Sequence, residues 1–323
     1  MLTTFLYRKG KPLETNISRA QMLQVLQEKE SLLWMDVEDP TEFESESLVE
    51  IFNFHPLAVE DCLTDNPHPK VDDYQEYLFI VMHAVGLNAE HKLTTVELDI
   101  FLGKNYVVTF HKEPVKSVNQ VRDSAQRKAD LVMGHGADLL VHAVLDHLVD
   151  NYKPVVDHYD ARIDLIEEGM FDHTPPKEYL GMVVQFKRDI FCLRRIVGPQ
   201  CDTANFLTRN TTPFIKPKHA MYFRDIYDHL FRIYGILEGF HEMITSILQV
   251  YFSNSSHKLN EVMKRMTVLA TLTMPSMIIA SIYGMNFRNI PELGLPYGYY
   301  AALGLMAAIT LSMLVWMKFK KWI

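Results

Sequence analysis

The sequence predicts an α/β domain on the cytoplasmic side of a membrane, followed by long stalk helices and a C-terminal transmembrane hairpin of two helices. Three observations predict this fold. The first third of the 323 residues is rich in strand patterns, the middle carries a long apolar stripe, and the last fifth contains two uncharged runs. Hydrophobic residues make up 48% of the chain and charged residues 22%, which excludes an intrinsically disordered protein.

Residues 1–125 mix strand and helix patterns and are predicted to form the α/β domain. Runs rich in β-branched and aromatic residues predict strands, and they lie at 31–38, 77–85, 94–103 and 105–111. Short helices are predicted at 42–52 and 58–64. The start of the chain lacks a basic segment followed by a long apolar core, so we expect no signal peptide.

Helical periodicity dominates from residue 126 onward. Residues 126–200 predict a helical hairpin, in which Pro175 and Pro176 end the first helix and the second helix runs to about Val197. After Pro217, apolar residues recur at spacings of three and four, which is typical of a helix that packs against other helices. This apolar stripe consists of Phe223, Ile226, Leu230, Ile233, Leu237, Phe240, Ile244, Ile247 and Tyr251. We predict one long helix over 217–287, with partner helices from the same chain, from other copies, or from both.

Two uncharged runs predict membrane-spanning helices. The first is about 22 residues long and lies between Arg265 and Arg288, and the second is about 25 residues long and lies between Glu292 and Lys318. A helix of about 20 apolar residues crosses a hydrocarbon core of about 30 Å. We therefore predict spans at about 266–287 and 297–317, with an extracytoplasmic loop at 288–296 and a basic tail at 318–323. A pair of buried core helices is the alternative.

Basic residues flank the two spans on one side of the membrane. Three of them precede the first span and three follow the second, namely Lys258, Lys264, Arg265, Lys318, Lys320 and Lys321. Segments rich in lysine and arginine stay in the cytoplasm. We therefore expect an integral membrane protein with both termini in the cytoplasm, in a bacterial or archaeal plasma membrane.

Composition and motifs exclude several classes of protein. The net charge of −8 argues against a nucleic-acid partner. Three cysteines without paired spacing exclude a disulfide scaffold and a paired-cysteine zinc module. Gly10-Lys11 lacks the rest of a phosphate-binding loop, and Thr245 stands where a zinc-protease motif at His241-Glu242 needs its second histidine. No enzyme is predicted.

The first span has the better face for lining a water-filled path. Neutral side chains recur there at helical spacing, namely Asn260, Met263, Thr267, Ala270, Met274, Met277 and Ser281. A hairpin of two helices cannot enclose a path by itself, so several copies would surround one axis. Composition alone leaves open whether the small residues only pack helices together. Pro275 removes a backbone donor, so we expect the carbonyl of Thr271 to need another partner.

Several motifs resemble those of CorA-type divalent cation channels. Tyr283-Gly284-Met285-Asn286-Phe287 closes the first span, Pro291-Glu292-Leu293 follows in the loop, and basic residues close the chain at 318–322. The resemblance extends to 55–57, 60–61, 222–225, 260–264 and 274–275, and therefore covers nearly the whole chain. A Gly-Met-Asn tripeptide alone is a weak signal, but its position at the end of the first of two spans is specific.

The resemblance implies a funnel-shaped homopentamer that conducts Mg²⁺, with Co²⁺ and Ni²⁺ as further ions. In this family the asparagine of the tripeptide binds the hydrated ion at the outer mouth, a role that Asn286 would have beside Tyr283, Gly284 and Met285. The inner constriction would consist of Asn260, Met263, Met266, Ala270, Thr271 and Met274. Leucine is frequent in the family at the position of Met266, so the sequence does not determine the shape of the gate at this position.

The resemblance also implies regulatory Mg²⁺ bound between the cytoplasmic domains of neighbouring subunits. Asp61 and Asp225 would hold one ion, with Glu60 and Asp146 near a second site. From the residues alone, these acids are better interpreted as solvated helix residues. At the outer mouth, Glu292 would attract cations, and Arg288 opposes that attraction.

The membrane potential suffices to drive such a channel, because a divalent ion gains roughly 4.6 kcal/mol across 100 mV. Amide and carbonyl oxygens suit hydrated Mg²⁺, and the two runs contain neither histidine nor cysteine for softer metals. Two alternatives remain, a related Zn²⁺ transporter of the ZntB type and a non-conducting, membrane-anchored coiled-coil sensor or scaffold. Met285 favours Mg²⁺ over Zn²⁺, and the neutral polar face favours conduction over a scaffold.

Overall fold

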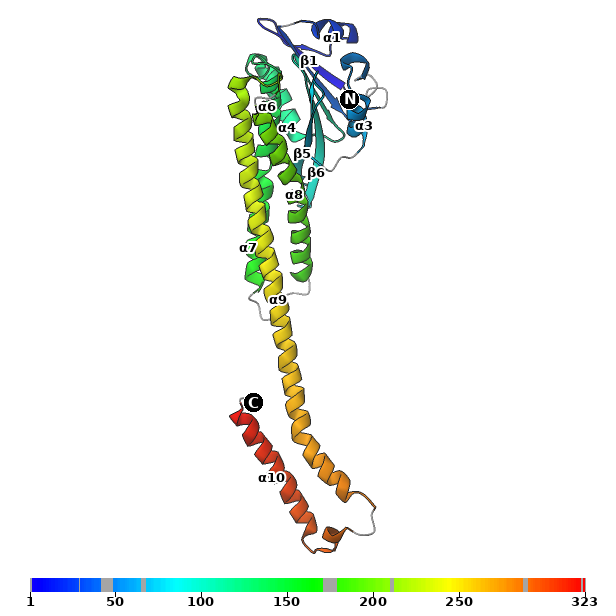
Figure 1. The fold of residues 1–323 in the computed structure, drawn as a ribbon, viewed down its shortest axis with the longest axis vertical. Coiled ribbons are helices and arrows are strands. Elements are labelled where there is room, and N and C mark those ends of the chain that lie inside the picture. The colour runs from blue at the N-terminus through cyan, green and yellow to red at the C-terminus, as the bar shows by residue number, and fades with distance from the viewer. Residues whose placement is uncertain are drawn as a thin grey trace. The chain divides into compact units, whose positions relative to one another are not determined.

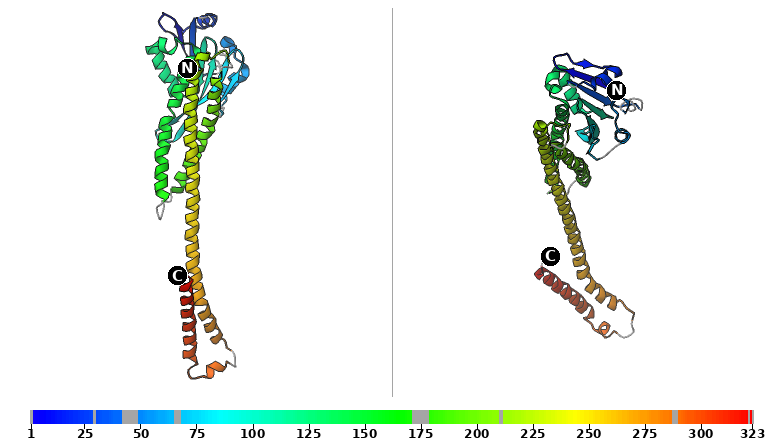
Figure 2. Two further views of the ribbon diagram at one scale, coloured as in Figure 1. Left: turned by 60° about the vertical axis from the view of Figure 1, so that its left-hand side comes forward. Right: turned by 45° about the horizontal axis from the view of Figure 1, so that its top comes forward.

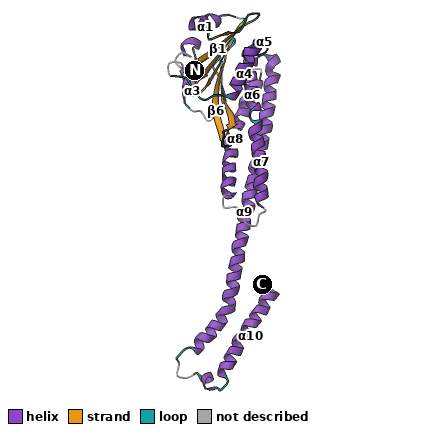
Figure 3. Cartoon of the chain, turned by 180° about the vertical axis from the view of Figure 1, so that it is seen from behind, coloured by secondary structure: helices purple, strands orange, loops and turns teal. Residues whose placement is uncertain are grey.

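The structure, a computed structural model, describes residues 2–28, 30–41, 49–64, 68–170, 179–209, 212–286, 290–320 and 322, without the side chains of residues 170, 292 and 293. The chain divides into two compact units, Met1–Ile247 and Leu248–Ile323. All strands in the described residues belong to the first unit and lie before residue 112 (Figure 3). The α/β domain and the C-terminal pair of apolar helices that the sequence predicts are both present.

A seven-stranded mixed sheet forms the frame of the first unit. In the described residues its strands follow the order β2-β1-β3-β7-β6-β5-β4, and neighbours are antiparallel except for β3 and β7. The strands are β1 (Leu2–Arg8), β2 (Glu14–Thr15), β3 (Ser31–Glu38), β4 (Lys70–Asp73), β5 (Leu78–Leu87), β6 (Leu93–Leu102) and β7 (Tyr106–His111). The four strands predicted from sequence are thereby confirmed as β3, β5, β6 and β7. The short strand β4 lies at the edge of the sheet.

Helices cover both faces of the sheet (Figure 1). Short helices α1 (Arg19–Val25) and α3 (Pro56–Leu63) pack on one face through an apolar cluster that includes Leu33, Phe79 and Phe101. On the other face lie α4 (Lys116–Arg127), α5 (Ala129–Val132) and α6 (Ala137–Asp150), and α6 contacts β6 and β7. The predicted helix at 58–64 is confirmed as α3. Most of the predicted helix at 42–52 lies outside the described residues. Its last four residues, 49–52, are described and are helical.

The predicted end of the second hairpin helix is wrong. The hairpin consists of α7 (Lys153–Met170) and α8 (Tyr179–Thr208), and α8 continues through Pro199 instead of ending near Val197. The residues after Pro199 explain this, because Gln200, Cys201 and Leu207 are buried. The Gln200 amide also donates to the hydroxyl of Tyr152 and accepts from the backbone N–H of His83. Tertiary packing therefore outweighs the helix-breaking tendency of proline. The proline pair at 175–176 lies outside the described residues.

The long helix α9 (Ala220–Tyr283) follows a short 3₁₀ turn at Pro217–His219. Within the first unit its apolar stripe is buried, as the spacing predicts, with Ile233 partly exposed. Phe240 of the stripe lies 6.1 Å from the ring of Phe186 on α8, and Arg194 on α8 pairs with Glu238 on α9 at 2.5 Å. The partners of the stripe up to Ile247 thus come from the same chain.

The second unit contains the last part of α9, a 3₁₀ turn at Pro291–Gly294 and the helix α10 (Gly298–Phe319). From the turn, α10 runs back beside the end of α9 (Figure 2). Both helices are long and apolar enough to cross a membrane, with mean hydropathies of 1.6 and 1.8 over their most apolar stretches. Those stretches are almost entirely unburied, which excludes the alternative of two buried core helices in this chain.

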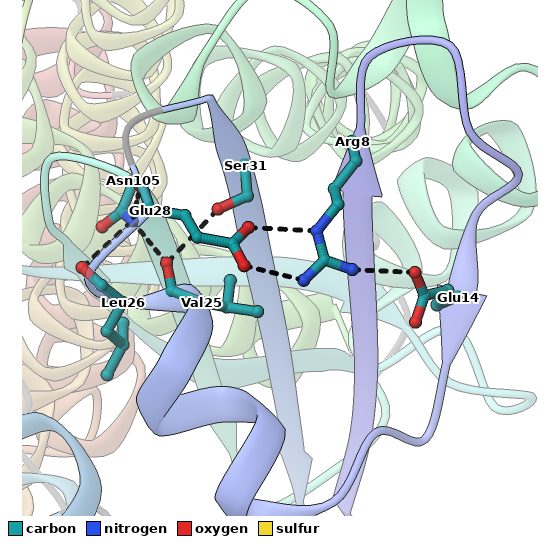
Figure 4. A network of polar contacts seen from close by, with 7 residues as sticks. All are labelled: Arg8, Glu14, Val25, Leu26, Glu28, Ser31 and Asn105. Carbon is teal, nitrogen blue, oxygen red and sulfur yellow. Dashed lines mark hydrogen bonds and ion pairs between the residues drawn. The ribbon is translucent and has the colours of Figure 1, made fainter.

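A polar network anchors the end of α1 to the sheet (Figure 4). The Asn105 amide, at the turn between β6 and β7, donates to the carbonyl oxygens of Val25 (3.1 Å), Leu26 (3.3 Å) and Glu28 (2.9 Å). Arg8 on β1 donates twice to the Glu28 carboxylate, at 3.0 Å each, and these hydrogen bonds lower the pKa of Glu28. The two amide hydrogens of Asn105 thus serve three carbonyls at the end of α1 and just after it, of which that of Val25 also accepts from the Glu28 N–H (3.0 Å) and the Ser31 hydroxyl (3.3 Å).

We predict that Asn105→Ala lowers the stability of the first unit by about 1–3 kcal/mol, because the carbonyls of Val25, Leu26 and Glu28 each lose a hydrogen bond. Thermal unfolding of the purified full chain measures the effect. Asn105→Asp keeps the shape but replaces the donor with a carboxylate, so it should destabilise at least as much. An Asn105→Asp variant as stable as the wild type would contradict the role of this amide.

Candidate functional site

The predicted pore face of α9 is exposed in the chain. Counted at about 100° per residue, the six residues of the predicted constriction span an arc of roughly 140° on the helix. Met263, Met266 and Met274 on this arc are between 60% and 65% exposed. Asn260 and Ala270 are also exposed, and Thr271 at the edge of the arc is half-buried.

The other side of α9 packs against α10. Half-buried residues recur there at spacings of three and four, namely Val268, Leu272, Ser276, Ile279 and Tyr283. The hydroxyls of Ser276 and Thr310 on α10 lie 3.3 Å apart and share a hydrogen bond. The middle of this packed side is roughly opposite the middle of the predicted pore face. The hairpin therefore leaves uncovered the face that the sequence assigns to the path.

Hydroxyl groups on α9 bond to the backbone of the preceding turn. Thr267 donates to the carbonyl of Met263 at 2.8 Å, and Thr271 donates to the carbonyl of Thr267 at 2.7 Å. Their hydrogens are therefore used inside the helix, and their oxygen lone pairs remain as acceptors. The helix continues through Pro275. This face can offer acceptor oxygens to water or to the hydration shell of a cation.

The motif at the end of the first span closes α9. Gly284 donates to the carbonyl of Ala280 at 3.0 Å, and Met285 donates to that of Ile282 at 3.2 Å. Asn286 follows in an irregular backbone and is exposed. The φ of Gly284 is not in the left-handed region, so the backbone conformation does not require a glycine here. A side chain there would instead crowd the Ala280 carbonyl oxygen, 3.2 Å from an added Cβ. Gly284 also lines a hollow of about 490 Å³ between α9 and α10.

The side chains of the acid and the base predicted to act at the outer mouth lie outside the described residues. Glu292 lies in the 3₁₀ turn at Pro291–Gly294, but its side chain is outside the described residues. Phe287 and Arg288 are also outside them. The predicted attraction by Glu292 and the opposing effect of Arg288 therefore stay predictions.

Asp61, the first of the predicted regulatory acids, already has a cationic partner. The ammonium Nζ of Lys70 on β4 lies 2.6 Å from Oδ2 of Asp61 on α3 and 2.8 Å from Oδ2 of Asp72. Burial opposes the charge on Lys70, but the hydrogen bonds to both carboxylates outweigh it and raise the pKa of Lys70. Glu60, the neighbour of Asp61, is exposed.

Asp146 and Asp225 both lie near His142, where α6 meets the start of α9. Both carboxylates act on the imidazole of His142, whose pKa burial lowers although the two acids act to raise it. The ring of His142 packs edge-on against Tyr222, with 5.4 Å between the ring centres. Asp225 is 64% exposed and lies 3.9 Å from His229. The sheet separates α3 from α6, so one chain does not bring Asp61 to Asp225 (Figure 1).

The sequence analysis missed Lys70 and His142. Side chains alternate between the two faces of a strand, so Lys70 and Asp72 lie on one side. The contact between these two residues could therefore be predicted from the sequence. The approach of Asp61 and the burial of His142 depend on tertiary packing. Across the described residues, no group of three or more histidine, cysteine or acidic side chains is arranged to hold a metal ion.

Comparison with known proteins agrees with this architecture. The family model for the CorA-like Mg²⁺ transporter protein matches residues 29–321. A putative metal ion transporter, YfjQ of Bacillus subtilis, is 36% identical over 90% of this chain and 89% of its own length. The cobalt/magnesium transport protein CorA of Thermotoga maritima is 36% identical over 85% of this chain and 78% of its own. The complete structure of the CorA magnesium transporter of Methanocaldococcus jannaschii superposes with a TM-score of 0.80 at 20% identity, covering 99% and 98% of the two chains.

Proposed function

The chain belongs to the CorA-like Mg²⁺ transporter family, and from this membership we propose that it forms a passive channel for Mg²⁺, with Co²⁺ and Ni²⁺ as further ions. Five copies surround one axis, and the first span of each copy lines the pore. Both termini lie in the cytoplasm of a bacterial or archaeal cell. The membrane potential drives entry, since a divalent ion gains roughly 4.6 kcal/mol across 100 mV.

The observation that carries this proposal is the neutral, uncovered face of α9 that ends at Gly284-Met285-Asn286. Amide and hydroxyl groups facing lipid would lose their hydrogen bonds to water, which costs free energy. Copies of the face around an axis keep those groups beside water. Its methionines are apolar and suit a constriction that closes by excluding water.

A second observation supports assembly from copies of this chain. Phe252, Leu259 and Val262 on α9 are 52–64% exposed, although they precede the uncharged run. In the cytoplasm, a row of large exposed apolar side chains indicates a protein contact. The other copies of α9 provide that contact in the proposed assembly.

The chemistry of the outer mouth suits a hydrated hard cation. Mg²⁺ holds its first-shell waters tightly and prefers oxygen ligands. A ring of Asn286 amide oxygens accepts hydrogen bonds from those waters without removing them. Binding of this kind is weak enough for release, which conduction requires.

Regulation is proposed to follow from like charges at the subunit boundary. Asp61 of one copy and Asp225 of the next repel each other without a cation, and Mg²⁺ between them favours the closed state. Glu60 and Asp146 contribute to a second site. The exposure of Asp225 and the separation of the two acids within one chain support a site shared by two copies.

Two other functions are less well supported. A Zn²⁺ transporter of the ZntB type would favour histidine or cysteine ligands along the path, and the uncharged runs contain neither. A non-conducting sensor or scaffold has no need for an uncovered neutral face on its membrane helix. Ion flux separates all three.

We predict that Asn286→Ala lowers Mg²⁺ flux into vesicles at least tenfold, because every subunit loses its amide oxygen at the mouth. Flux is measured with purified full chain in liposomes under a negative internal potential. Asn254→Ala removes another exposed asparagine of α9, outside the uncharged run, and should leave the flux unchanged. Equal flux in the wild type and Asn286→Ala would refute the assigned role of Asn286, and a wild type without flux would refute the channel.

We predict that a cysteine at Met274 reacts at least tenfold faster with a charged thiol reagent than a cysteine at Leu311. The two side chains are similarly exposed in one chain, 60% and 65%, but only Met274 faces the proposed pore. A thiol facing lipid does not ionise and stays unreactive. Burial raises the pKa of the native Cys62 and Cys192 thiols, and that of Cys201 to about 11, so their background reaction is slow. Similar rates at the two positions would contradict the orientation of α9.

We predict that Asp225→Asn raises the Mg²⁺ concentration needed for closure about tenfold, because one charged ligand is lost. Protection of the full chain from limited proteolysis by Mg²⁺ reports closure. Asp164→Asn, an exposed acid on α7, is the control and should leave the protection unchanged. Unchanged protection in both Asp225→Asn and Asp61→Asn would exclude regulation at these carboxylates.

A further inference from the structure

The carboxylate that is proposed to bind regulatory Mg²⁺ is held by a cation of its own chain. Lys70 contacts Asp61 at 2.6 Å, closer than it contacts Asp72 at 2.8 Å. Lys70 and Asp61 are each about one-third exposed, so the ion pair lies at the protein surface rather than in the core. It joins α3 to β4, the edge strand of the sheet. A neighbouring subunit or an ion can therefore reach it.

The surroundings of Lys70 allow it to release Asp61 at low cost. Asp72 remains as a hydrogen-bonding partner on the same side of β4, and the ammonium lies 5.5 Å from the centre of the Phe79 ring. The aromatic face and the second carboxylate both stabilise a positive charge. Lys70 would therefore not be left as an unpaired cation if an ion took its place at Asp61.

Lys70 and a divalent cation compete for Asp61, because both are positively charged. The ammonium, which two carboxylates share, offsets part of the charge of Asp61 and repels an approaching dication. For charges of one and two about 5 Å apart in nearly aqueous surroundings, this repulsion weakens ion binding about tenfold. The Lys70–Asp61 ion pair, being at the surface, contributes less free energy to folding than a tenfold change in the binding of a divalent ion represents.

We propose that Lys70 competes with regulatory Mg²⁺ for Asp61 and thereby sets the cytoplasmic Mg²⁺ concentration at which the channel closes. When the ion binds, Lys70 loses its contact with Asp61 and keeps its contact with Asp72. This inference rests on the proposed regulatory role of Asp61. It assigns to Lys70 a positioning role, because Lys70 acts through the carboxylate and does not itself contact the ion.

The test measures the Mg²⁺ concentration that gives half-maximal protection of the full-length protein from proteolysis. Lys70→Met should lower this concentration about tenfold, and Lys70→Gln, which keeps a hydrogen-bond donor without the charge, should lower it similarly. Lys70→Arg keeps the charge and should stay within twofold of the wild type. Lys92→Met removes another lysine that pairs with a carboxylate at 2.6 Å, that of Glu90, and should also stay within twofold.

A purely structural ion pair gives a different result. Lys70→Met would then lower thermal stability without lowering the half-maximal Mg²⁺ concentration, and this outcome overturns the proposal. A higher half-maximal concentration in both neutral variants also overturns it. In an Asp61→Asn background, Lys70→Met should produce no further shift, since the contested carboxylate is gone.

Flux measured on the same preparations separates this inference from the proposed function. A wild type that conducts Mg²⁺ but shows no protection by Mg²⁺ overturns both the regulatory site and the role of Lys70, while the pore stands. A shift in Lys70→Met in a protein that does not conduct supports the competition at Asp61 and refutes the channel.

Discussion

Polar groups in a membrane need hydrogen-bonding partners, and this requirement governs the C-terminal unit. The threonine hydroxyls of α9 satisfy it locally by donating to carbonyls one turn back. The amide of Asn286 at the end of the span has no equivalent solution within a helix, and α10 covers the opposite side of α9. The hairpin is therefore incomplete as a single copy. In the proposed assembly, water enclosed by several copies supplies the missing partners, and the same water makes a path for a hydrated ion.

One continuous helix carries two different kinds of interface. Up to Ile247, the apolar stripe of α9 is buried by helices of its own chain, such as α8 through Phe186. Beyond it, Phe252, Leu259 and Val262 are exposed. The point where the chain stops covering its own helix is thus the point where the proposed contacts with other copies begin. A family of proteins that assemble in a membrane offers an explanation for this change, whereas a monomeric soluble protein would not leave such a row exposed.

The sequence predicted the helices and strands better than it predicted the tertiary contacts between them. The strands at 31–38 and 105–111 and the uncharged helices follow from local composition, and the structure has them. The passage of α8 through Pro199 could not be predicted, because it depends on buried contacts of Gln200 with Tyr152 and His83. At the candidate site, periodicity identified the exposed face of α9. It could not show that Lys70 holds Asp61, since nothing local links α3 to the edge strand.

The same ion is proposed to meet two different chemistries, and the difference suits the two tasks. In the pore, neutral oxygens contact the hydration shell, so the ion leaves as easily as it enters. At the regulatory site, carboxylates of two subunits bind more tightly, and binding has to persist long enough to hold subunits together. Two unopposed carboxylates would stay occupied at low Mg²⁺ and keep the channel closed. An ammonium beside one of them weakens that site without removing it. In this proposal, the charge of Lys70 raises the Mg²⁺ concentration range over which the carboxylate site fills and empties, so that the channel opens and closes within that range.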